Sequence, residues 1–168
     1  HEQAQRVCER FIGRPSVLQL DKNKQITDLA IVLNLIPLPD RSPLMEEAFA
    51  MLLASGTVAD MQLVLDLLEL EIVETPRAAA SLRTLDQAEP AVMQSGSLGD
   101  IARQWRILRG LALEATGQLE EAAAVLDTQD RLDEQTPTLN AMQREALQGI
   151  LDRVHSRLEV SEGVSRTP

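Results

Sequence analysis

The chain has almost no aromatic residues and almost no cysteine. Its 168 residues include one Trp, two Phe and no Tyr, and the aromatic share is 2%. The single cysteine, Cys8, excludes a disulfide within the chain and a metal site built from cysteines. Cys8 shares an apolar helical face with Val7 and Phe11, so we expect a buried structural thiol.

Long apolar runs and positive charge are also scarce. A membrane-spanning helix needs roughly 18 apolar residues, whereas the densest stretch, 61–73, is interrupted by Asp66, Glu69 and Glu71. The 16 Lys and Arg residues face 26 Asp and Glu residues, which gives a net charge of −10. Such a chain repels phosphate backbones. We therefore expect no membrane span and no nucleic-acid partner.

Residues that build catalytic or metal sites are few. The histidines are His1 and His155, and the glycines stand singly instead of forming a phosphate-binding loop. The segment from Asp21 begins like a calcium loop, but Ile26 occupies the sixth position, where such a loop requires Gly. We interpret His155 as a solvated or helix-capping residue. We expect no enzyme activity, no catalytic residue, no cofactor and no metal.

What the chain does contain is regular helix punctuation. Turn signals occur at Gly56, Thr75–Pro76, Gly96, Gly117 and Thr136–Pro137, which are separated by 19, 21, 21 and 19 residues. Each interval holds one helix of about 16–18 residues and a short turn. Glycine suits the left-handed position that ends a helix, and Thr followed by Pro suits the start of the next one.

Turns this short make neighbouring helices pack antiparallel. The spacing, with apolar stripes at helical intervals, predicts an all-α fold of stacked antiparallel helical hairpins, an α-solenoid. Pro90 predicts a break between a helix over 76–88 and a short helix that begins at Pro90. We expect one all-helical domain over 1–160, with an N-terminal helix and irregular segment over 1–42, a hairpin array over 43–160 and a flexible tail over 161–168.

Residues 108–126 resemble the hairpin of the tetratricopeptide repeat (TPR). Gly110 and Gly117 stand seven apart, as in that repeat, where one glycine lies at the helix crossing and the other at the turn. The other matching packing positions are Ala112, Leu113, Leu119, Ala122 and Leu126. The chain departs from the repeat at Arg106 and Arg109, where the family has apolar residues. The resemblance, over 103–128, implies a TPR-like scaffold that binds peptides or partner proteins without chemistry of its own.

One basic cluster stands out against the acidic background. Arg103, Arg106 and Arg109 lie three apart on one predicted helix. The core stripe of that helix is Ile101, Trp105, Leu108 and Ala112. At 100° per residue, Arg103 and Arg106 point away from this stripe and Arg109 flanks it. We interpret the three as a partner-binding surface for an acidic segment or a carboxylate; the alternative is a solvated face with scattered ion pairs.

We therefore expect a non-catalytic helical-repeat scaffold or adaptor that binds another protein or a peptide. A second interpretation is a structural or assembly subunit that self-associates or packs into a larger complex, because the helix over 61–73 is apolar almost all round. A third is a small-ligand sensor or enzyme. We expect a cytoplasmic location; a periplasmic or exported protein stays open, because the chain begins at His1 instead of Met.

Overall fold

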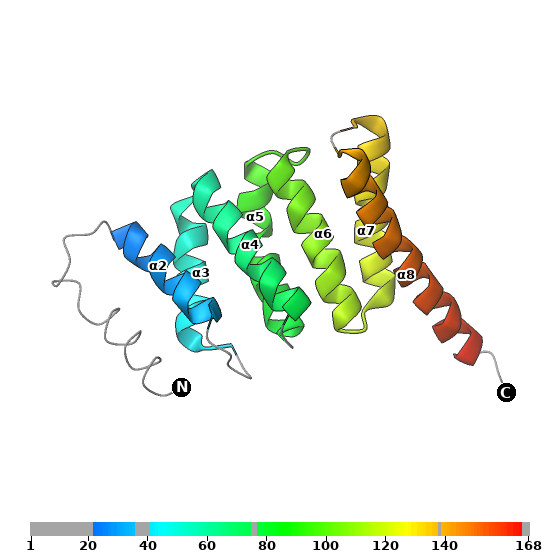
Figure 1. Cartoon of the computed structure of the whole chain (residues 1–168), viewed down its shortest axis with the longest axis horizontal. Helices are drawn as coiled ribbons and strands as arrows, with labels where there is room; N and C mark the ends of the chain where they lie inside the picture. Colours follow the sequence, from blue (N-terminus) through cyan, green and yellow to red (C-terminus); the bar gives the residue numbers. More distant parts are fainter. Residues whose placement is uncertain (1–21, 36–40, 75–76, 138, 166–168) are drawn as a thin grey trace.

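The computed structural model describes residues 22–35, 41–74, 77–137 and 139–165 (Figure 1). These residues form α2 (Lys22–Leu35), α3 (Pro43–Ser55), α4 (Val58–Glu74), α5 (Ala78–Gln94), α6 (Asp100–Ala115), α7 (Leu119–Gln135) and α8 (Ala141–Ser165). No strand occurs in this part of the chain, so the all-α prediction is confirmed. The predictions for Cys8 and for Thr75–Pro76 concern positions outside the described residues. The calcium-like segment is part of a helix from its second residue on, because α2 begins at Lys22.

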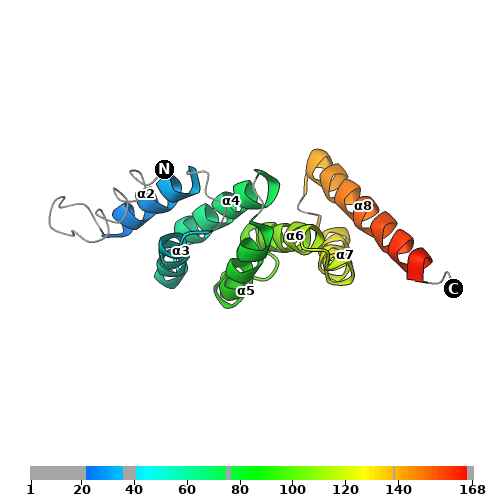
Figure 2. The ribbon, with the colours of Figure 1, turned by 90° about the horizontal axis from the view of Figure 1, so that it is seen from below.

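The helices lie in two rows. Figure 2 shows α2, α4 and α8 on one side and α3, α5 and α7 on the other, with α6 between α4 and α8. Each helix contacts the next one along the chain, and α4 also contacts α2 and α6. The contact between α6 and α8 is much smaller than the contact between α4 and α6.

Three glycine turns fall where the sequence predicts them. Gly56, Gly96 and Gly117 have φ values of 69°, 125° and 80°, a region that glycine enters without strain. After the first of these turns, Thr57 Oγ1 accepts a hydrogen bond of 3.2 Å from the backbone N–H of Asp60. This is the N-capping role that the sequence predicts for Thr57.

The predicted break at Pro90 is wrong, because α5 continues through it. Pro90 and Asp86, four residues earlier, are both exposed. The carbonyl of Asp86, which receives no hydrogen bond because Pro90 lacks an N–H, therefore lies on the solvent side. Ala88 and Val92 are fully buried and hold both halves of the helix against the core. Packing thus outweighs the local cost of the proline.

The predicted start of the last helix at Thr136–Pro137 is also wrong. The helix α7 ends at Gln135, and α8 begins at Ala141. Asn140 provides the cap: its Oδ1 accepts from the N–H of Gln143 at 2.9 Å, and Gln143 Oε1 accepts from the N–H of Asn140 at 3.0 Å. This reciprocal arrangement satisfies two backbone donors at once. The opposite end differs too, because 161–165 continue α8 where the sequence predicts a tail.

The core is built mainly from aliphatic side chains. One buried cluster joins α2 to α6 and includes Phe49, Leu68 and Leu85, and a second joins α6, α7 and α8 around Leu126 and Leu147. The helix α4 contacts α2, α3, α5 and α6, which explains why it is apolar on most sides. None of the described helices has the length and apolarity to cross a membrane.

Candidate partner-binding groove

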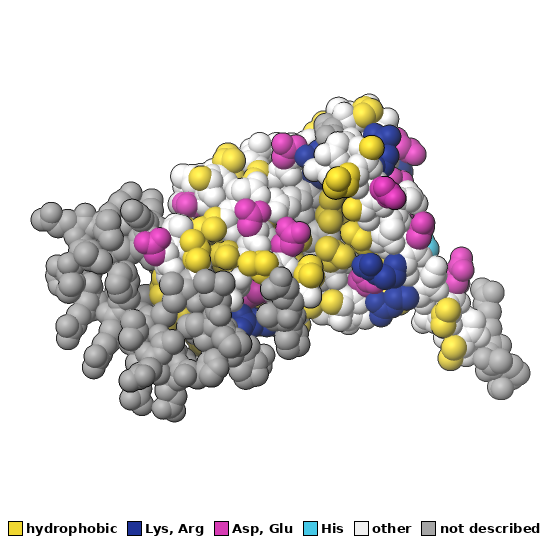
Figure 3. Space-filling model, in the orientation of Figure 1, with side chains coloured by type: hydrophobic (Ala, Val, Ile, Leu, Met, Phe, Trp, Pro, Cys, Tyr) yellow, Lys and Arg dark blue, Asp and Glu magenta, His cyan; other side chains and the backbone are white. Residues whose placement is uncertain are grey.

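A groove of about 320 Å³ opens between α6 and α8, with α4 along one edge. We call it the α6–α8 groove. Its apolar lining includes Ile107, Leu111, Leu139, Ala146 and Ile150, and its polar lining includes Gln62, Glu69, Asp100, Arg103, Gln104 and Gln143. Figure 3 shows hydrophobic side chains gathered along the space between α6 and α8. This groove is the strongest candidate for a binding site in the described part of the chain.

The helix α8 makes little contact with α6 and is held at two points. Near its start, Asp133 on α7 accepts from the N–H of Leu139 at 3.2 Å and pairs with Arg144 at 3.4 Å. Near the other end of α6, Glu114 pairs with Arg153 and Arg157 of α8. The start of α8 is therefore tied to α7, and its second half is tied to the end of α6.

The Glu114 site is a partly buried carboxylate shared by two arginines. Arg153 donates to it twice, at 2.6 and 2.7 Å, and Arg157 Nη1 donates to Oε1 at 3.2 Å. The hydrogen bond from Arg153 is the main reason that the pKa of Glu114 lies below its ordinary value, with Arg157 adding to it against the opposing effect of burial. The same hydrogen bond raises the pKa of Arg153. These contacts fix one end of the groove.

The α4 edge of the groove is acidic. Asp66 and Glu69 are exposed on α4. Asp66 Oδ1 accepts from the side-chain amides of Gln62 at 2.8 Å and Gln104 at 2.9 Å, which joins α4 to α6. Asp100 forms an ion pair with Arg103 three residues later. The positive charge of Arg103 is thus balanced by Asp100. Asp66 and Glu69 therefore give the α4 edge a net negative charge.

The three arginines singled out from the sequence do not share one surface. Arg103 lines the α6–α8 groove. Arg109 faces α5, where its Nε lies 3.0 Å from Oδ1 of Asp86 and its guanidinium lies 5.8 Å from the centre of the Trp105 ring. A step of three residues turns about −60° around a helix, so the side chains of the three diverge across α6.

The predicted outward direction of Arg106 is wrong. This residue is 9% exposed and donates to Gln129 Oε1 on α7 at 3.1 Å and to the carbonyl of Ser97 at 2.6 Å. Burial lowers the pKa of its guanidinium. The TPR resemblance contained the signal, because the family has an apolar residue at this position. Arg106 fills that interior position and joins α6 to α7.

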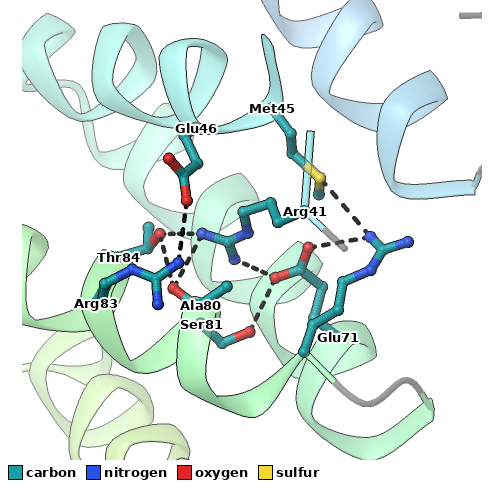
Figure 4. A network of polar contacts seen from close by, with 9 residues as sticks. Arg41, Met45, Glu46, Glu71, Ala80, Ser81, Arg83 and Thr84 are labelled. Carbon is teal, nitrogen blue, oxygen red and sulfur yellow. Dashed lines mark hydrogen bonds and ion pairs between the residues drawn. The ribbon is translucent and has the colours of Figure 1, made fainter. Parts of the chain in front are cut away.

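A buried polar cluster around Glu71 is not predicted by the sequence. Glu71 on α4 is 1% exposed and accepts hydrogen bonds from Arg77 at 3.3 Å, from Ser81 at 2.9 Å and from Arg41 (Figure 4). Arg41 also donates to the carbonyl of Ala80 at 3.1 Å. Its guanidinium lies 5.0 Å from the ring centre of Phe49, and its Nε has no hydrogen-bond partner.

The spacing could have revealed this cluster. Glu71 follows Leu68 by three residues, a spacing that places both on one face of a helix, and an acid on an apolar face needs a buried cation. Its partners come from the residue that precedes α3 by two positions and from the start of α5. The cluster therefore joins α3, α4 and α5 and has a structural role.

The other titratable side chains in the described part of the chain form no comparable site. His155 is exposed, and its Nε2 lies 3.2 Å from Oδ1 of Asp127 on α7. Within the described residues, no group of three or more His, Cys, Asp or Glu side chains is placed to hold a metal ion. Comparisons with protein-family models, curated proteins and solved structures found no match to this chain.

Proposed function

We propose that this chain is a non-catalytic scaffold or adaptor that binds a segment of another protein in the α6–α8 groove. The two rows of helices, with a TPR-like hairpin formed by α6 and α7, support a helical-repeat stack of TPR type. In such a stack the helices of one row present side chains to a partner. The observation that carries the proposal is the groove itself, with an apolar floor left open between α6 and α8.

Arg103 is the member of the predicted arginine surface that belongs to this proposed site, because it lines the groove. Arg106 supports the site indirectly by joining α6 to α7. Arg109 is directed toward α5 by its ion pair with Asp86. The proposal therefore narrows the arginine surface to one residue and adds the apolar floor around Ile107 and Ile150.

Ala146 offers a direct test. It is exposed and lines the groove, so Ala146→Gln fills the groove without removing a core side chain. Ala124→Gln is the matched control, because Ala124 is also an exposed helical alanine but lies on α7. Affinity purification with both variants should recover a partner that Ala124→Gln retains and Ala146→Gln loses. Partners recovered equally with both variants would contradict the groove.

Self-association is a second candidate, favoured by one observation. Near the start of α7, α8 exposes Val160 and Val164, which are 69% and 72% exposed and line a shallow hollow together with Leu119. Exposed apolar side chains in contact with one another favour association. Light scattering of the wild type and of Val164→Gln tests this candidate. A concentration-dependent dimer that the substitution abolishes supports it, whereas a monomer at high concentration contradicts it.

A further inference from the structure

We infer that the segment bound in the α6–α8 groove carries lysine or arginine next to large apolar side chains. The inference rests on the proposed function and adds the chemistry of the partner. The arginines of α6 predict an acidic partner from the sequence alone. The groove itself has a net negative charge, which favours a basic partner instead.

Only one cation lies among the described residues that line the groove, and this is Arg103. Its ion pair with Asp100 cancels one positive charge against one negative charge. Glu69 lines the groove from α4, and Asp66 lies one turn earlier on the same helix with amide partners only in its described hydrogen bonds. Because amides carry no net charge, these two carboxylates set the sign of the α4 edge.

The acidic edge and the apolar floor lie on different elements. The acids are on α4, whereas Ile107 and Leu111 come from α6 and Ile150 comes from α8. A partner that fills the groove therefore has to place apolar side chains between α6 and α8 and to direct its charged side chains toward α4. A cationic side chain there is attracted by the carboxylates of Glu69 and Asp66, whereas an anionic side chain is repelled by them.

The exposure of the charges at the α4 edge also determines how strongly a charge reversal there should weaken binding. Glu69 is exposed, so its attraction is screened by salt and acts strongly on the rate of association. We expect Glu69→Lys to weaken binding of a basic segment by about five- to tenfold at low salt. The effect should shrink as the ionic strength rises toward about 0.5 M.

The experiment is a selection from a displayed library of short random peptides on the wild-type chain. Peptides that also bind Ala146→Gln are removed, so that only binders that depend on the groove remain. The melting temperatures of wild type and variant are compared first, so that loss of fold is not read as loss of binding. We expect the remaining peptides to carry a net positive charge and at least two large apolar residues.

A selected peptide is then synthesised and titrated calorimetrically against the wild type, Glu69→Lys and Glu89→Lys. Glu89 is an exposed acid on α5, outside the groove, and serves as the matched control. We expect weaker binding with Glu69→Lys only. Peptides that depend on the groove but are acidic, or show no charge preference, would overturn this inference and leave the proposed function standing. A library without any groove-dependent peptide would overturn both.

Discussion

A Cβ atom added to Gly110 on α6 would lie 2.5 Å from Cδ2 of Leu126 on α7. Leu126 is fully buried, and its Cγ would lie 2.6 Å from the added atom, so the branch of the side chain and not only its end would have to shift. The two helices approach each other here more closely than any side chain at position 110 would permit. The TPR resemblance predicts a close helix crossing at Gly110, and the approach of α6 and α7 at this position agrees with that prediction.

The substitution Gly110→Ala should therefore destabilise the chain. Overpacking a core costs about 1–3 kcal/mol, which exceeds the gain of about 1 kcal/mol from replacing a helical glycine with alanine. Gly149→Ala is the control, because Gly149 lies within α8 with no atom within 4 Å of an added Cβ. Urea unfolding should show a loss of stability for Gly110→Ala and a gain for Gly149→Ala. A gain for both would show that the helices are not in close contact at Gly110.

Glu71→Gln should be among the most damaging single changes in the chain. It would leave the guanidiniums of Arg41 and Arg77 buried without their shared carboxylate. Breaking a buried ion pair by removing one partner costs about 3–5 kcal/mol. Glu46→Gln is the control, because Glu46 and its partner Arg83 are both exposed and such pairs contribute about 0–1 kcal/mol. Equal losses of unfolding free energy would contradict the burial of Glu71.

Arg106→Met tests whether Arg106 is structural. The change leaves the carbonyl of Ser97 and the side-chain oxygen of Gln129 without their donor. Gln129 is buried, so its unpaired oxygen costs about 1–3 kcal/mol, whereas Ser97 is exposed and its carbonyl can bond to water. Arg83→Met, at an exposed position, should cost less than about 0.5 kcal/mol. Thermal or denaturant unfolding of both variants distinguishes the roles, and an unchanged midpoint for Arg106→Met would restore Arg106 as a surface residue.

The Glu114 carboxylate gives a pH-dependent contribution to stability. Its pKa in the folded chain is depressed by Arg153, so its contribution is fully present above the unfolded-state value of about 4.3 and is lost as the pH falls through the lower folded-state pKa. Glu114→Gln should therefore be less stable than the wild type at about pH 7, and the difference should shrink below about pH 4. Unfolding free energies measured across this range check the prediction. A difference that does not change with pH would contradict it.

The turns and the helical class could be predicted because they depend on local residues. Gly56, Gly96 and Gly117 occupy left-handed turns since few other residues tolerate them. The error at Pro90 arises because tertiary packing determines where that helix ends, whereas at Thr136–Pro137 a local capping pair, Asn140 and Gln143, competes with the Thr–Pro signal. Buried neighbours keep α5 continuous through its proline, and the Asn140 cap sets the start of α8.

The candidate groove could be predicted only in part. Helical spacing identifies Ile150 and Leu147 as apolar residues of α8, but it does not show that α8 makes little contact with α6. The position of α8 depends on contacts between distant residues, such as Glu114 with Arg153, which sequence spacing does not reveal. The side of α6 on which Arg106 lies is likewise determined by α7, which covers it.

The most direct test of the central claim is the position of a bound peptide. A groove-dependent peptide can be titrated into the chain labelled at isoleucine methyl groups, with shifts followed by NMR. We predict that the methyl signals of Ile107 and Ile150, which line the groove, shift strongly, while that of Ile31 on α2 stays in place. Shifts confined to α2, or to residues outside the α6–α8 groove, would contradict the account.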